Sequence, residues 1–513
     1  MRKFLLAGAA ALALALPAQA QKTNLVVGMA AQDIGRIDPH LAPTTIDKVV
    51  VGWMFNGLVR FPPGSIDPAK LEPDIAERWE SSPDGKVWTF HLRRGVQFQQ
   101  GFGELTADDI VFSLKKAATA GQSAFTADFA AFEKVEAIDP YTVRITLKNV
   151  VPSLLGIVAN IHGGNIVSRR AVEERGEAFA RNPVGTGPFQ VASHTPNQSL
   201  ELVAHDGYFR GKPIIQRISY RFIPSNASRD LAFQSGELDL NYGQSDQSWV
   251  RRMRALPGVA VDVFEPAELA NLNLDITKPP LNDIRVRQAI ASAVNRDDLV
   301  RWRGAEISRA AVSVVPVGYL GTDPNPGLFP IILDRATQLL AEAGYPNGLT
   351  IKIVHTQLPE MLNAMQVIQQ QLKRAGINLD IETTEHGAWH QRIRRAESPI
   401  VYYAAARFPV ADVYLTQFFH SRSNIGTPTA VTNFSHCSVA DAEIDAARTE
   451  TDRARQIALW QEAQKKIVAD VCAVPLFETL LAWARKDSLD WSYDLQGSLS
   501  LGPLVTERTR FTR

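Results

Sequence analysis

The chain has 513 residues, 54 Lys and Arg balanced by 54 Asp and Glu, 45% hydrophobic residues and two cysteines. This length allows two or three domains, and the composition excludes a collagen, a coiled coil and a disordered chain. No block of clustered cations is present, which argues against a nucleic-acid partner, because non-specific phosphate binding needs clustered Lys and Arg. Two cysteines are too few for a Cys-rich zinc site.

The N-terminus has the organisation of a secretory signal. Two cations, Arg2 and Lys3, precede the apolar run 4–16, and small residues at Ala18 and Ala20 form a cleavage site. The run is too short to span a bilayer. We therefore expect residues 1–20 to be a signal peptide that is cleaved on export to the periplasm.

After the signal, predicted strands and helices alternate, which is typical of α/β layers. Strands are predicted at 24–29 and 87–92, a helix at 106–116, and β-hairpins at 135–147 and 189–203. The chain then becomes more helical, with helices at 284–294, 334–343, 362–375 and 440–471 and strands at 349–354 and 377–383. Short Pro- and Gly-rich stretches mark boundaries without long linkers, so we expect closely apposed domains with a ligand cleft between them.

The sequence contains no recognisable catalytic constellation. There is no His-Glu-x-x-His pair, no Gly-x-Ser-x-Gly elbow and no Walker loop. His386 and His390 stand four residues apart at a predicted helix start, a spacing compatible with one metal ion, but no third ligand accompanies them. We interpret them as polar helix residues and expect no metal, no cofactor and no enzymatic activity.

Several blocks along the chain resemble one known family. They occupy residues 76–98, 105–113, 182–189, 235–239, 279–290 and 339–346. Together they resemble family 5 extracellular solute-binding proteins, the dipeptide, oligopeptide and nickel receptors of ABC importers. Ordered blocks over nearly the whole mature chain are more specific than any single motif.

The resemblance implies an α/β fold with two lobes around a cleft, the type II periplasmic binding protein of cluster C with an extra subdomain in lobe I. We place lobe I at 22–56, 185–271 and 485–513, the inserted subdomain at 57–184, and lobe II at 272–484. The chain is expected to cross between the lobes near 271–274 and near 481–486. Closure of the lobes would bury the ligand.

The resemblance also implies a function. The protein would be a monomeric receptor that captures a small solute, peptide-like or anionic, in the cleft and delivers it to the permease subunits of an ABC importer. Two alternatives stay open, namely a secreted hydrolase with an unrecognised site, and a periplasmic chaperone or sensor built on the same scaffold.

Some ligand contacts follow from matching positions. The block 37–40 resembles the family's Leu-Asp-Pro-His, and the loop after it faces the cleft in peptide-binding members, which points to Thr44 and Thr45 as hydroxyl donors. Exposed turn threonines are the alternative. Phe125 falls where an aromatic residue often lines the subdomain wall. His386 falls where a pocket tryptophan is common, and Trp389, one turn later, is either a second wall or core.

The stretch 403–412 indicates which ligands are excluded. Peptide-binding members carry an aspartate here that pairs with the α-ammonium of the peptide, after a tryptophan. In this chain Arg407 takes the aspartate position and Ala404 the tryptophan position. Arginine would repel an ammonium, so we predict a solute that offers Arg407 a carboxylate or phosphate, with His386 and Phe408 nearby. The alternative is that Arg407 pairs with Asp412 or another surface acid.

The two cysteines flank a predicted helical hairpin. In an oxidising compartment Cys437 and Cys472 could form a disulfide. The helices are unequal, so at ~1.5 Å per residue Cys472 overshoots Cys437 by about a dozen ångströms unless the flanking chain runs back. We favour the disulfide because two exposed thiols would be reactive; the alternative is two free thiols.

Overall fold

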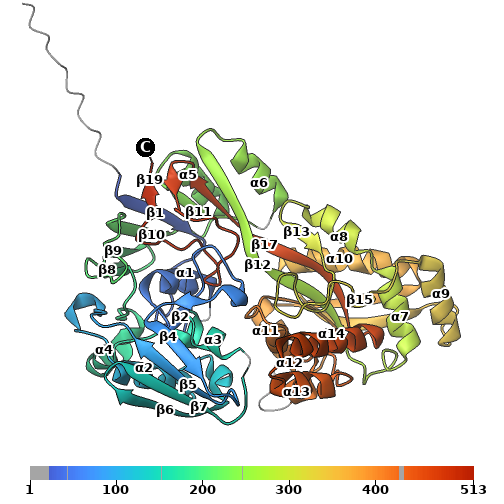
Figure 1. Ribbon diagram of the computed structural model, residues 1–513. Helices are drawn as coiled ribbons and strands as arrows, with labels where there is room; N and C mark the ends of the chain where they lie inside the picture. The colour runs from blue at the N-terminus through green and yellow to red at the C-terminus, as the bar shows by residue number, and fades with distance from the viewer. Residues whose placement is uncertain (1–21, 43, 152, 245, 427–431, 513) are drawn as a thin grey trace, which may run out of the picture.

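The computed structural model describes residues 22–512 except 43, 152, 245 and 427–431, so the predicted signal segment 1–20 lies outside the described residues. Two α/β lobes lie side by side, and two long strands, β12 (Val259–Leu274) and β17 (Ala473–Lys486), run between them (Figure 1). We call the lobe with β1 and β19 the first lobe, and the lobe with α7 to α14 the second lobe. The molecule is therefore a two-lobed α/β protein.

One large mixed sheet extends through both lobes. Among the described residues its order is β16-β12-β17-β11-β1-β10-β9-β8, and β13 also pairs with β17. Leu25, Val27 and Met29 alternate along β1 and are fully buried, as expected for a strand with one face in a core. β1 is parallel to both of its neighbours. In the first lobe the strands are β1 (Asn24–Met29), β8 (Phe189–Thr195), β9 (Ser199–Ala204), β10 (Arg217–Phe222) and β11 (Leu240–Tyr242).

Helix α1 (Thr45–Met54) packs on this sheet. It begins after Thr44, whose hydroxyl accepts a hydrogen bond from the Asp47 amide and donates one to the Asp47 carboxylate at 2.6 Å. Farther along, the buried Trp53 ring meets Tyr220 of β10 edge-on at 5.7 Å. The other helices here are α5 (Asn226–Gln234) and α6 (Gln247–Arg254), and the C-terminal strands β18 (Leu489–Asp490) and β19 (Arg510–Phe511) pair with each other.

A four-stranded antiparallel sheet, β4-β5-β7-β6, forms a separate layer beside the first-lobe core, within residues 57–184. Helix α2 (Ala107–Ala118) covers it and starts with a capping box between Thr106 and Asp109. The remaining elements of this segment are β2 (Val59–Arg60), β3 (Glu72–Pro73), β4 (Ala76–Ser81), β5 (Val87–Leu92), β6 (Phe132–Asp139), β7 (Thr142–Leu147), α3 (Leu154–Ile157) and α4 (Arg169–Arg175).

The second lobe is mainly helical. Its strands are β13 (Ser308–Ala310), β14 (Leu349–Thr356), β15 (Ile377–Thr384) and β16 (Ile400–Ala405), and its helices are α7 (Ile284–Ala293), α8 (Arg296–Arg303), α9 (Leu333–Glu342), α10 (Pro359–Arg374), α11 (His386–Arg394), α12 (Ala411–Phe419), α13 (Asp441–Thr449) and α14 (Arg453–Ala469). Cys437 and Cys472 are joined by a disulfide, with 5.8 Å between their Cα atoms. The disulfide closes the loop that contains α13 and α14.

The two long strands form the connection between the lobes. The first part of β12 pairs with 481–486 of β17, and its last part pairs with both β17 and β16. The register shifts between Phe264 and Glu268, which is N-terminal to the crossing expected at 271–274. At this point Arg309 bridges Glu265 of β12 and the fully buried Glu478 of β17, each at 2.6 Å. The domain boundaries drawn from the sequence stay predictions.

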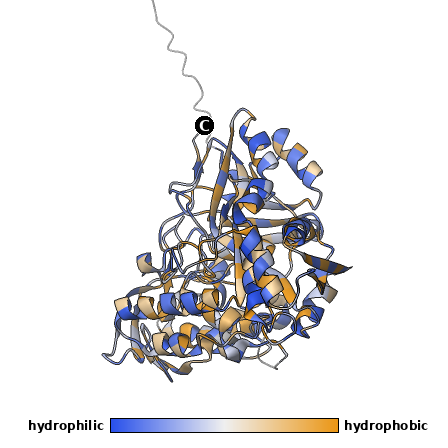
Figure 2. Cartoon of the chain, turned by 90° about the vertical axis from the view of Figure 1, so that its right-hand side faces the viewer, coloured by the Kyte–Doolittle hydropathy of each residue, from blue (hydrophilic) through white to orange (hydrophobic). Residues whose placement is uncertain are grey.

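Hydrophobic residues fill both lobes. Figure 2 shows orange hydrophobic stretches on the central strands and blue hydrophilic ones on the surrounding helices. One large cluster of buried side chains fills most of the first lobe and its four-stranded layer, and a smaller cluster around Trp249 lies beside it. The second lobe has separate clusters on the two sides of its part of the sheet. Phe408 packs against clusters of both lobes.

The predicted elements match the observed ones closely. The strands predicted at 24–29 and 87–92 have those bounds, and the predicted helices and hairpins agree within a few residues. The long helical stretch at 440–471 is two helices, α13 and α14. The sequence analysis did not foresee the lengths of β12 and β17, because buried crossing strands lack a simple two-residue alternation.

Candidate functional site

The two lobes touch at Phe408, the third residue after the end of β16. Its ring lies 5.8 Å from that of Phe61 in the first lobe. It also covers Gly156 of α3 so closely that a Cβ there would lie 1.8 Å from the Phe408 ring. Phe408 packs against the hydrophobic clusters of both lobes. This contact fixes how near the lobes stand.

Arg407 precedes this contact and has a firmly held backbone. Its amide donates to the Tyr319 hydroxyl at 2.9 Å, and that hydroxyl donates to the Arg407 carbonyl at 2.7 Å. The guanidinium lies 5.0 Å from the Phe418 ring centre, with Nε donating to Gln417 and Nη1 to the Ala406 carbonyl. Among the described residues Nη2 has no hydrogen-bond partner, and Arg407 makes no ion pair. One edge of the guanidinium is thus available to a ligand.

Arg407 does not pair with Asp412 in the structure. Asp412 pairs instead with Arg448, whose Nε lies 3.1 Å from the carboxylate. The charge of Arg407 also acts on groups of the first lobe, because it helps to lower the pKa of Lys48 and opposes the rise in the pKa of Asp128.

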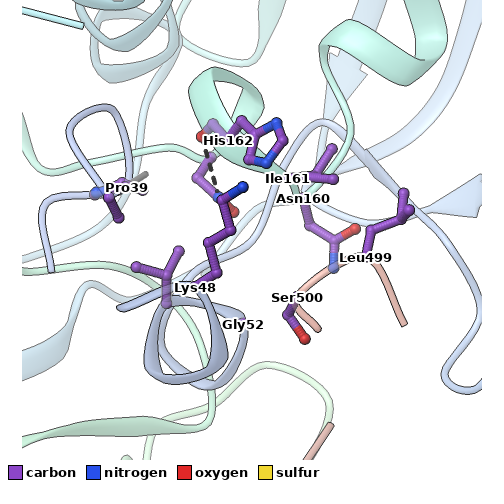
Figure 3. A pocket seen from close by; sticks show the side chains of 11 residues that line it. Pro39, Lys48, Gly52, Asn160, Ile161, His162, Leu499 and Ser500 are labelled. Atoms are coloured by element: carbon purple, nitrogen blue, oxygen red, sulfur yellow. Dashed lines mark hydrogen bonds between the residues drawn. The ribbon is translucent and has the colours of Figure 1, made fainter. Parts of the chain in front are cut away.

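Lys48 supplies a second cation, from the first lobe. It projects from α1 into a small pocket of the first lobe, toward the loop that carries Asn160 and His162 (Figure 3). The pocket is lined by side chains of α1, of the short helix η4 (His162–Gly164) and of the C-terminal segment near Ser500. Burial lowers the pKa of Lys48 to about 8, with Arg407 adding to the shift and Glu268 opposing it. The charge of Arg407 thus acts on Lys48 although the two residues belong to different lobes.

Two carboxylates interact electrostatically with Arg407. Glu268 lies on β12 at the register shift, and Asp128 lies in the short helix η3 (Thr126–Phe129) of the inserted layer. Both residues are solvent-accessible, although many protein atoms lie around their carboxylates. Burial raises the pKa of Asp128 to about 6 against the effect of Arg407. Burial also raises the pKa of Glu268, against the effects of Arg303, Arg407 and Lys48.

Phe125 and His162 form an aromatic wall beside Lys48. Their rings stack at 4.3 Å between centroids with an angle of 6° between the planes. Burial, with Lys48 and Arg407 adding to it, lowers the pKa of His162 well below its ordinary value. The ring is therefore neutral at pH 7, and its Nε2 atom is buried without a hydrogen-bond partner among the described residues. This wall offers a flat surface and one polar atom.

Thr44, Thr45 and Ala404 were also predicted to contact the ligand. Thr44 caps α1, so its hydroxyl is already engaged with Asp47, and Thr45 is the first residue of that helix. Ala404 lies on β16 opposite Ala270 of β12. These residues lie close to Lys48 or Arg407 in the sequence. Among the described residues, no side-chain hydrogen bond or ion pair joins them to either cation.

His386 and Trp389 belong to a different cluster. Trp389 is fully buried in a small second-lobe core, so of the two interpretations the core one holds. His386 stacks on it at 5.5 Å and lies 4.6 Å, ring to ring, from His390. Among the described residues no group of three or more His, Cys, Asp or Glu is placed to hold a metal ion. A series of ring contacts through Trp389, Tyr403 and Phe418 links His386 to Arg407, so the prediction that His386 lies near the ligand stays a prediction.

Sequence reasoning missed four residues of this site: Lys48, Asp128, His162 and Glu268. Two of them had a signal. Lys48 is the one cation inside the apolar run of α1, and Glu268 is an acid in a strand whose later residues are all buried. A lone charge in an apolar element needs either a partner or a function.

Comparison with known proteins identifies the family. The family model described as bacterial extracellular solute-binding proteins, family 5 (middle) matches residues 70–426. The chain belongs to this family. Its members are transport receptors, and this protein is accordingly a substrate-binding protein of the ABC-transporter type that holds a small ligand between its lobes.

Individual relatives bind different ligands. The structure of MoaA from A. tumefaciens R10 in complex with mannopinic acid is 53% identical, with a TM-score of 0.85, and the match covers 96% of this chain and 100% of that one. DppA from Helicobacter pylori in complex with the peptide STSA is 26% identical, with a TM-score of 0.79 and coverage of 96% and 98%. The dipeptide-binding protein of Escherichia coli K12 is 27% identical over 454 residues, which are 82% of each chain.

In the part of the chain that the structure describes, no helix combines the length and the apolar character needed to cross a bilayer.

Proposed function

We propose that this protein captures a small organic anion in the cleft between its lobes, in the periplasm, and delivers it to the permease of an ABC importer. The observation that carries the proposal is that two cations form no ion pair among the described residues: Arg407, next to the Phe408 contact between the lobes, and Lys48, in a pocket of the first lobe. A carboxylate placed between them would bridge the lobes and favour closure.

The nature of Arg407 argues against ordinary peptides. An α-ammonium brought to this position would meet a guanidinium in a cleft with little water, and a desolvated like-charge contact costs several kcal/mol. The identity of 53% to MoaA supports an acid as ligand, because that protein was solved with mannopinic acid. Mannopinic acid is therefore our first candidate, and delivery to a permease rests on family membership.

Isothermal titration calorimetry tests the proposal. The mature protein is titrated with mannopinic acid, with glutamic and glutaric acids, and with di- and tripeptides. We expect at least one of the acids to bind, peptides to bind weakly or not at all, and Arg407→Ala to lower affinity for the acid by about 10- to 100-fold, as for loss of a charge-assisted contact.

The control is Arg374→Ala. Arg374 ends α10 on the exposed surface of the second lobe, so its removal changes the net charge equally without touching the cleft. Tight binding of unmodified peptides, or equal affinities for Arg407→Ala and Arg374→Ala, would contradict the proposal.

A further inference from the structure

A short segment of the second lobe lies on a helix of the first lobe. Helix α8 ends at Arg303, and residues 304–307 then run along α6 before β13 begins at Ser308. Ile307 is fully buried in a first-lobe cluster that contains Trp249 of α6. These four residues therefore connect the lobes in addition to β12 and β17.

The chain approaches α6 very closely at Gly304. Its φ of +111° lies in the left-handed region that favours glycine. A Cβ there would lie 2.3 Å from the Cβ of Gln247 on α6, so a larger residue would push the segment away from the helix. Gln247 also accepts a hydrogen bond from the Glu306 amide at 3.2 Å. The backbone of the segment thus fits this helix.

The Glu306 carboxylate pairs with two arginines of the same helix. Arg251 Nε lies 2.6 Å from one carboxylate oxygen, and Arg254 Nη1 lies 2.8 Å from the other. The two arginines are three residues apart, so they share one face of α6. The Glu306 side chain is 30% exposed, less than either arginine. One carboxylate that follows the second-lobe helix α8 thus binds two cations of the first lobe.

The segment ends where the sheet passes between the lobes. β13 pairs with residues 477–479 of β17, and Arg309 on β13 lies 2.6 Å from both Glu265 of β12 and Glu478 of β17. Residues 304–307 are therefore joined to the crossing strands at one end and to α8 at the other. A rotation of the second lobe about β12 and β17 moves α8 relative to α6 and pulls on this segment.

We infer that residues 304–307 are a strap that ties α8 to α6 and restrains opening of the lobes, with Glu306 as its ionic contact. A firmly attached strap limits how far the lobes separate without ligand. Because more of the ligand-free protein is then close to the binding arrangement, a ligand is bound more tightly. The strap concerns the lobes themselves and does not depend on which ligand the cleft accepts.

The ionic contact makes the strap sensitive to salt. All three charged side chains are at least 30% exposed, so dissolved ions screen their attraction. The screening length falls from about 10 Å at 0.1 M salt to about 3 Å at 1 M. We therefore expect the ligand-free lobes to separate further as the ionic strength rises.

Pulsed electron paramagnetic resonance on the ligand-free protein measures the separation of the lobes. Spin labels are attached at Lys134→Cys on β6, beside the first lobe, and at Lys465→Cys on α14 of the second lobe, where the native side chains are more than half exposed. The native cysteines, Cys437 and Cys472, are buried and joined by a disulfide, so they do not take up the label.

The variants remove the ionic contact from either side. One is Glu306→Gln, and the other is the double variant Arg251→Gln/Arg254→Gln. The control is Glu173→Gln, which removes an exposed ion pair with Arg169 at 2.7 Å inside α4, within one lobe. Thermal unfolding checks that each variant is folded.

We expect Glu306→Gln and the double arginine variant to shift the distance distribution to longer distances, and Glu173→Gln to leave it unchanged. The three substitutions together should shift it no further than Glu306→Gln alone, because the same contact is lost. Raising NaCl from about 0.05 M to about 0.5 M should lengthen the wild-type distances and leave those of Glu306→Gln unchanged. Calorimetry with mannopinic acid should show an affinity about 3- to 10-fold lower for Glu306→Gln.

The ligand-free distances decide the inference. Equal distributions for wild type and Glu306→Gln, equal shifts in Glu306→Gln and Glu173→Gln, or shifts that add when the variants are combined would each overturn the strap and leave the proposed function standing. If no acid binds, the proposed function fails, while the ligand-free distances still confirm or overturn the strap.

Discussion

Two lysines of the first lobe differ in their partners and in their burial, since Lys116 is buried and Lys48 is half-buried. Lys116 of α2 donates to Asp38 at 2.8 and 3.0 Å and lies 3.3 Å from His40, so it joins two segments of one core. Lys48 of α1 has no such partner among the described residues and faces a pocket and the opposite lobe. A buried charge that has a partner stabilises the fold. An unpaired charge at the boundary between the lobes is available to bind a ligand.

Breaking the paired lysine should have the largest effect. Lys116→Met leaves the Asp38 carboxylate buried and uncompensated, so we expect the free energy of unfolding to fall by about 3–5 kcal/mol. Chemical denaturation measures it, and ligand affinity of the remaining folded protein should be unchanged. A loss below about 1 kcal/mol would show that Asp38 finds water or another partner.

Closure of the lobes should depend on Gly156. A methyl group there would overlap the Phe408 ring, so Gly156→Ala should hold the lobes apart and lower ligand affinity by about 10- to 100-fold with little change in stability. Calorimetry gives the affinity. Small-angle scattering should give a larger radius of gyration for ligand-bound Gly156→Ala than for ligand-bound wild type. Adding Phe408→Ala removes the overlap and should recover part of the affinity. Identical scattering and affinity in wild type and Gly156→Ala would contradict this role.

The unpaired lysine should show the reverse pattern to Lys116. Lys48→Met removes a cation that burial disfavours, so the free energy of unfolding should stay within about 1 kcal/mol or rise. Affinity for an acidic ligand should fall by about 10-fold, because one charge-assisted contact is lost. Denaturation and calorimetry on the same preparation separate the two effects, and a destabilisation like that of Lys116→Met would mean that Lys48 has a structural partner.

A smaller effect is expected from pH. The pKa of Lys48 is lowered to about 8 in the folded protein, so its charge is present at pH 7 and largely lost by pH 9. Affinity for an acid should therefore fall about fivefold from pH 7 to pH 9. Because the unfolded chain keeps this proton to higher pH, the Lys48 contribution to stability should rise over the same interval. Lys48→Arg, which keeps its charge, should abolish both trends; a pH-independent affinity in the wild type would contradict them.

Much of the fold followed from local patterns. The alternation of Leu25, Val27 and Met29 predicts β1, and the cap at Thr106 predicts the start of α2, because such signals act between residues a few positions apart. The family followed from several motifs in order, and the change to Arg407 at one position indicated the sign of the ligand.

The sequence by itself thus determined the α/β class, the family, the helices and strands and one cation of the site. Only the tertiary structure decided that the charge of Arg407 acts on Lys48, Glu268 and Asp128, that Trp389 is core, and that Phe408 rests on Gly156. The physical reason is separation along the chain. Local propensities fix each element, whereas the positions at which distant elements meet depend on packing of both lobes around β12 and β17, which no short stretch of sequence encodes.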